Sequence, residues 1–60
     1  MWIICDNGNM VNMDRITNII KDKRGTVCCT QDNEILVSKM DVRPTIRVAL
    51  ESEYKTLEVR

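Results

Sequence analysis

The chain has 60 residues, with nine lysines and arginines balanced by nine aspartates and glutamates, and it contains no histidine. A chain of this length forms a single small domain, residues 1–60, and buries only about 60% of the surface that its unfolded form exposes, so we expect marginal stability unless a partner contributes. The lack of histidine removes the commonest general base and the usual nitrogen ligand of zinc, and zero net charge argues against sequence-independent nucleic-acid binding.

The first predicted elements are strands at residues 2–5 and 10–13, joined by the polar turn Asp6-Asn7-Gly8-Asn9. Asparagine, aspartate and glycine tolerate the positive φ angles of tight strand reversals, so this pattern predicts a hairpin. A second polar group at residues 12–15 predicts a corner directly after the hairpin, because Asn and Asp side chains bond to nearby backbone groups.

Three further strands are predicted at residues 16–21, 26–30 and 34–39. The first of these segments also has the spacing of one helical turn, but its β-branched residues favour a strand. A charged reversal that ends at Gly25 precedes the second strand, and a polar turn at residues 31–34 precedes the third. Alternation in the third strand predicts one face formed by Ile35, Val37 and Lys39, and the opposite face formed by Leu36, Ser38 and Met40.

A helix is predicted over residues 43–54, with Pro44 in its first turn and Asp41 or Ser38 as its cap. Residues 45–48 also alternate as a strand would, so a strand stays open there, and a terminal strand is predicted at residues 57–59. The fold class is therefore α+β: a small antiparallel β-meander of about five strands, with one C-terminal amphipathic helix packed on the sheet. The apolar stripe of this helix is formed by Ile46, Ala49, Leu50, Tyr54 and Leu57.

The three cysteines, Cys5, Cys28 and Cys29, cannot all pair within one chain. We expect them to be small apolar fillers in a reducing compartment, because the spacing of structural zinc ligands is missing and no cation or histidine adjoins them. No signal peptide or transmembrane segment is recognised, which predicts a cytoplasmic protein with no membrane partner. We expect no enzyme activity, no catalytic or metal-binding residues and no cofactor, since phosphate-binding glycine loops and general bases are also missing.

One cluster of basic residues is a candidate interaction patch: Lys21, Lys23, Arg24, Arg43 and Arg47. Such a patch is able to contact phosphates, but Asp22 interrupts it and only two aromatic residues are available for base stacking. A charged turn that keeps the sheet soluble is therefore the favoured interpretation, and we expect nucleic-acid binding to be unlikely.

The order of these signals resembles that of short bacterial proteins of the flagellar FlbD type. There, too, a hairpin with Asn-Gly near its tip leads into a V-N-x-D-x-I-x-x-I segment, which here spans residues 11–19. Two strands around a polar turn and an amphipathic segment follow in both. This chain departs from the pattern in its second turn, which carries Asp32-Asn33, and in the basic Arg43-Pro44 start of its last segment. The resemblance implies a β-rich accessory or regulatory protein and carries no active site.

These observations predict a small non-enzymatic module that regulates or binds another protein, whose identity the sequence does not give, and that forms a homodimer. Exposed sheet edges and a one-sided helix are surfaces suited to strand addition or groove docking. Two alternatives stay open: an inhibitor of a host nuclease or defence complex, encoded by a phage or another mobile element, and a nucleic-acid-binding regulator.

Overall fold

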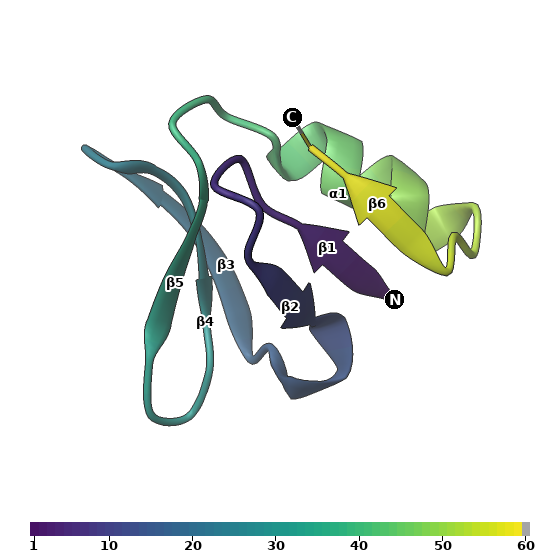
Figure 1. Ribbon diagram of the computed structural model, residues 1–60, viewed down its shortest axis with the longest axis horizontal. Helices are drawn as coiled ribbons and strands as arrows, with labels where there is room; N and C mark the ends of the chain where they lie inside the picture. The colour runs from purple at the N-terminus through teal and green to yellow at the C-terminus, as the bar shows by residue number, and fades with distance from the viewer. Residues whose placement is uncertain (60) are drawn as a thin grey trace.

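The computed structural model describes residues 1–59 and has an α+β architecture (Figure 1). The elements in chain order are β1 (Trp2–Ile4), β2 (Met10–Asn12), a 3-10 helix η1 (Met13–Arg15), β3 (Asn18–Asp22), β4 (Gly25–Cys29), β5 (Glu34–Ser38), α1 (Arg43–Glu51) and β6 (Thr56–Glu58). Every strand predicted from the sequence is present in some form, with boundaries shifted by one or two residues.

The strands form two separate sheets, so the prediction of one five-stranded meander was wrong. Sheet A has the order β2-β1-β6 and sheet B has the order β3-β4-β5. Sheet A is also not purely antiparallel, because β6 pairs with β1 in parallel, with Ile3 opposite Leu57. A meander cannot supply that pair, since parallel strands require a crossover, which here includes α1.

The break between the two sheets lies at the predicted corner after β2. The Asn12 side chain accepts a hydrogen bond from the Asp14 backbone N–H at 3.0 Å and caps η1. This tight turn redirects the chain, so β3 starts away from β2 and pairs with β4 instead. The strand interpretation of residues 16–21 was right in kind, with β3 lying slightly later.

The predicted alternation of faces in β5 was wrong at its end. Val37 and Ser38 are adjacent yet both are buried. The register with β4 shifts between Thr26 and Val27, so that Ser38 lies opposite Thr26 while Leu36 lies opposite Val27. A β-bulge of this kind inserts one extra residue and turns two successive side chains inward, an event that a strict two-residue period does not predict.

Helix α1 is shorter than predicted and is not the last element. It ends at Glu51, because Glu53 adopts a φ of 59° and the Tyr54 backbone N–H returns to the Ala49 carbonyl at 3.0 Å. This left-handed ending frees the chain to form β6, which confirms the predicted terminal strand. Pro44 lies in the first turn as expected, but Val42 is the cap residue and makes no side-chain cap bond.

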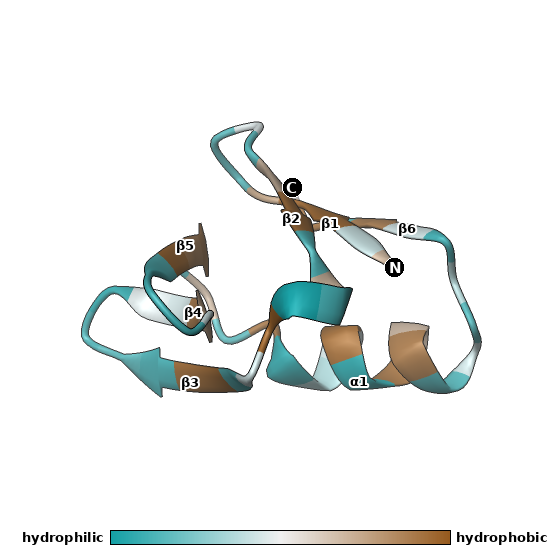
Figure 2. Cartoon of the chain, turned by 90° about the horizontal axis from the view of Figure 1, so that it is seen from below, coloured by the Kyte–Doolittle hydropathy of each residue, from teal (hydrophilic) through white to brown (hydrophobic). Residues whose placement is uncertain are grey.

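The core lies between sheet A, sheet B and α1. Figure 2 shows α1 along one face of sheet A, with sheet B beside them. The helix contributes Ile46 and Ala49 to this core, which confirms a helix packed on a sheet. The buried apolar cluster consists of Ile3, Cys5, Val11, Cys28, Val37, Ile46, Ala49 and Leu57.

Thr26 is the polar residue at the centre of the fold, with no exposed surface. Its Oγ1 donates to the Met40 carbonyl at 2.7 Å and accepts from the Val42 backbone N–H at 2.9 Å. One hydroxyl therefore ties β4 to the segment that enters α1. Within residues 1–59, no buried side-chain nitrogen or oxygen lacks a hydrogen-bond partner.

Candidate interaction site

The basic cluster predicted from the sequence is a surface of mixed charge. Arg24 donates from Nη2 to Asp22 Oδ2 at 2.6 Å and to Glu34 Oε1 at 3.0 Å. Hydrogen bonds from the Arg24 side chain and backbone lower the pKa of the Asp22 carboxyl. The guanidinium charge at this hairpin is therefore compensated by two carboxylates.

Arg43, at the start of α1, is paired in the same way. Its Nε and Nη2 donate to the two carboxylate oxygens of Asp41, both at 2.8 Å. The Arg43 hydrogen bonds lower the pKa of Asp41 to about 2, and the charge of Lys21 contributes to this lowering. Asp41 thus has two basic neighbours, Arg43 of α1 and Lys21 of β3. Lys23 and Arg47 are exposed.

Two of the three cysteines lie in environments that disfavour a reactive thiolate. Cys5 and Cys28 are fully buried and free, while Cys29 is half-buried. Burial raises the pKa of Cys28 to about 11, and burial together with the charge of Asp6 raises the pKa of Cys5. Both buried thiols are therefore protonated at neutral pH, where a nucleophilic thiolate would be needed. In the described part of the chain, no three Cys, Asp or Glu residues are grouped to hold a metal ion.

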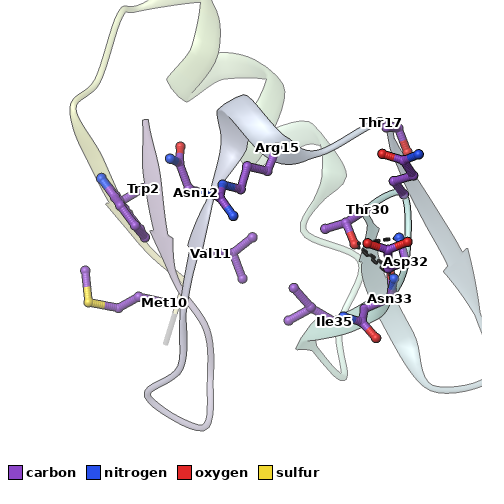
Figure 3. Close-up of a pocket in the computed structure, with 11 residues that line it drawn as sticks. Trp2, Met10, Val11, Asn12, Arg15, Thr17, Thr30, Asp32, Asn33 and Ile35 are labelled. Atoms are coloured by element: carbon purple, nitrogen blue, oxygen red, sulfur yellow. Dashed lines mark hydrogen bonds between the residues drawn. The ribbon is translucent and has the colours of Figure 1, made fainter.

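A groove between the two sheets was not predicted from the sequence. This β2 groove encloses about 750 Å³ and is lined by Trp2, residues 10–12, Arg15, Thr17, residues 30–33 and Ile35 (Figure 3). One wall is therefore β2 with η1, and the other is the turn between β4 and β5. The groove exists because β2 has no strand partner on its second side, which is a property of the sheet order rather than of any local motif.

The backbone of β2 has unpaired groups along this open edge. Ile3 and Val11 form a hydrogen-bonded pair, as the flanking bonds from Cys5 N to Asn9 O at 2.7 Å and from Met13 N to Met1 O at 2.9 Å establish. Because such pairs alternate in an antiparallel ladder, the residues next to Val11 direct their backbone groups away from β1. Met10 therefore presents its N–H and C=O, and Asn12 its N–H, along the edge that faces the groove.

The opposite wall is an ordered turn. The Thr30 backbone N–H donates to the Asn33 carbonyl at 2.8 Å, and Thr30 Oγ1 accepts from the Asn33 N–H at 3.0 Å. A longer bond runs from the Asp32 N–H to the same hydroxyl at 3.3 Å. These hydrogen bonds define the conformation of the turn that forms this wall of the groove.

Two opposite charges line the groove without meeting. Arg15, from η1, and Asp32, from the β4–β5 turn, are both exposed. Among residues 1–59, neither side chain makes a hydrogen bond or an ion pair, although the other carboxylate-arginine neighbours described above do. Each of these two charges is therefore available to a ligand in the groove.

The outer face of sheet A adjoins the groove and is uncovered. Trp2, Ile4 and Met10 lie on this face, because their neighbours Ile3, Val11 and Leu57 point into the core. Trp2 is 44% exposed and Met10 is 58% exposed, and both also line the groove. Helix α1 covers only the inner face (Figure 2). The sequence predicted the hairpin of residues 2–13 but did not say which of its faces is buried.

A second, smaller hollow lies between α1 and β6. It is lined by Pro44, Thr45, Val48, Ala49, Tyr54 and Leu57. Its members Val48 and Tyr54 are more than half exposed, since α1 ends before Tyr54 reaches the predicted apolar stripe.

Comparison with protein-family profiles, with curated protein sequences and with solved structures gave no match to this chain. Along residues 1–59, no helix is both long enough and apolar enough to cross a membrane.

Proposed function

We propose that this protein is a small non-enzymatic interaction module that regulates another protein by binding it. The observation that carries the proposal is the continuous open surface formed by the β2 groove and the adjoining apolar face with Trp2 and Met10. Large side chains exposed beside unpaired strand backbone are typical of surfaces that receive a partner. The resemblance to FlbD-type proteins supports the same accessory or regulatory role. A cytoplasmic location, where free thiols stay reduced, is part of this proposal.

Two features weigh against an enzyme and against a nucleic-acid-binding regulator. The buried, protonated thiols of Cys5 and Cys28 supply no nucleophile for an enzyme. The pairing of Arg24 and Arg43 with carboxylates leaves little of the accumulated positive field on which nucleic-acid affinity depends. A protein partner, or a second copy of this chain, is therefore the occupant that we propose for the open surface.

The test compares two substitutions at positions of equal exposure. Met10 and Val48 are each 58% exposed, the first on the proposed surface and the second on α1. We expect Met10→Asp to weaken self-association in light scattering, or capture of a host protein from lysate, by at least roughly tenfold, which is about 1.4 kcal/mol. Val48→Asp serves as the matched control and should leave both unchanged. A wild-type protein that is monomeric and captures no protein would refute the proposal.

A further inference from the structure

We propose that the β2 groove binds a short extended segment of a partner protein as an additional strand along β2, with an acidic side chain of that segment against Arg15. This inference rests on the proposed function and names the chemistry of the partner. It follows from three properties of the groove: unpaired backbone groups on one wall, a cation with no partner among residues 1–59, and apolar side chains in its lining.

The backbone of β2 supplies the orientation of the segment. Two residues of β2 direct backbone groups outward: Met10 its N–H and C=O, and Asn12 its N–H. Their two-residue spacing is that of the hydrogen-bonding groups at the free edge of a sheet. An extended chain at this edge meets these groups with its own backbone, whereas a helix, whose backbone bonds are internal, does not. The short length of β2, three residues, limits the paired part of the segment to a few residues.

The charges of the groove select the side chains of the segment. Arg15 lines the groove and has no carboxylate partner among residues 1–59, unlike Arg24 and Arg43, which are both paired. A guanidinium in a groove binds a carboxylate through charge-assisted hydrogen bonds, often two at once. Asp32, across the groove, has the opposite preference and favours a basic or hydroxyl side chain on the segment. The occupant is thus a strand that carries an acidic residue, with a donor side chain for the other wall.

The apolar part of the groove lining suits apolar side chains on the same strand. Val11 and Ile35 face each other from the two walls (Figure 3). Met10 and Trp2 line the groove from the outer face of sheet A, and the flexible thioether of Met10 adapts to different neighbours. Because residues alternate in direction along a strand, one sequence can present apolar and acidic residues to these different sites.

Selection from a displayed library of random heptapeptides, with the full chain as bait, tests this proposal. We expect wild-type protein to enrich peptides in which apolar residues alternate with Asp or Glu. Arg15→Glu should reverse the preference toward Lys or Arg, because it inverts the charge and removes no bond of the fold. Arg47→Glu, which changes an exposed cation of α1 outside the groove, is the matched control and should select the same acidic peptides as wild type.

A second pair of variants tests strand addition itself. The Met10 N–H does not bond to β1, so proline at this edge position breaks no bond of sheet A; it removes the outward donor and the side chain and fixes φ at about −65°. With the best selected peptide as the probe and the fluorescence of Trp2, the only tryptophan, as the readout, we expect Met10→Pro to bind roughly 3- to 10-fold more weakly than Met10→Ala. Thermal unfolding establishes that each variant is folded.

The outcomes separate this inference from the proposed function. Peptides that show no acidic preference, or whose preference ignores Arg15→Glu, would overturn the inference and leave a protein-binding role standing on the outer face. Equal affinities for Met10→Pro and Met10→Ala would overturn strand addition. A library that yields no enriched peptide would overturn the inference as well, while self-association or capture that is sensitive to Met10→Asp would still support the proposed function.

Discussion

Gly25 begins β4 at the point where the chain passes closest to the end of β5. Its φ is +123°, a value that residues with a side chain rarely adopt. A Cβ built on it would overlap the Ser38 carbonyl oxygen and lie 2.7 Å from both the Cα and the carbonyl carbon of Lys39. The obstacles are backbone atoms of Ser38, which pairs with Thr26, and of the adjoining Lys39, so they cannot rotate away as a flexible side chain would.

The cost of Gly25→Ala follows from these two terms. The backbone conformation costs about 1–3 kcal/mol, and shifting the neighbouring strand costs about 1–3 kcal/mol more. The sum, roughly 2–6 kcal/mol, compares with a total stability of about 3–9 kcal/mol for a domain of this size. We therefore expect a variant that is partly or largely unfolded at 25 °C.

Gly8→Ala is the matched control for this prediction. Gly8 also has a positive φ, +90°, but a Cβ there would meet no atom within 4 Å. Only the conformational term applies, about 1–2 kcal/mol. Urea unfolding followed by Trp2 fluorescence and far-ultraviolet circular dichroism measures both variants. If the free energies of unfolding of the two variants agree to within about 0.5 kcal/mol, the close approach of Gly25 to the end of β5 does not add to the cost of Gly25→Ala.

Three further outcomes are expected. Thr26→Val should destabilise the fold by about 2–4 kcal/mol in urea unfolding, because it leaves a buried donor and a buried acceptor unpaired, while Thr26→Ser should cost less since it keeps the hydroxyl. Iodoacetamide at pH 8 should modify the half-buried Cys29 before the buried Cys28 in peptide mass spectrometry, and equal modification rates would contradict the burial of Cys28. The free energy of unfolding should decline as pH rises from about 9 to 11, because the fold favours the neutral Cys28 thiol. The Asp41 carboxyl has a lowered pKa of about 2, so its pairing with Arg43 stabilises the fold above pH 4 and is lost as pH falls toward 2, and Asp41→Asn should flatten that part of the stability profile.

Local elements of this fold were readable from the sequence, because each is encoded by a few adjacent residues. The Asp6-Asn7-Gly8-Asn9 turn, the polar corner after β2 and Pro44 at the start of α1 all act within one or two turns of chain. The assembly of those elements was not readable. Whether β6 pairs with β1 depends on packing between residues more than 50 positions apart, as for Trp2 and Thr56. Whether β2 pairs with β3 depends on how the two sheets pack around the core, which no local pattern encodes.

For the candidate site, too, local features were predicted from the sequence and the assembly was not. Sequence proximity drew attention to the basic residues around Arg24, but it did not reveal that Glu34, ten residues later, would neutralise part of that charge. The groove arises from the missing partner of β2 and from a turn that lies across from it. A lone Arg15 and an exposed Met10 carry no pattern that distinguishes them from ordinary surface residues.

The parallel pair of β1 and β6 has a consequence for how the chain folds. Sheet B consists of neighbouring hairpins and closes only short loops, whereas sheet A is completed only when residues 56–58 meet residues 2–4. Closing so large a loop is slow, because its entropy is lost before any contact is gained. We therefore expect the hairpins of sheet B, and the β1–β2 hairpin of sheet A, to form first, and β6 to join β1 in the last step.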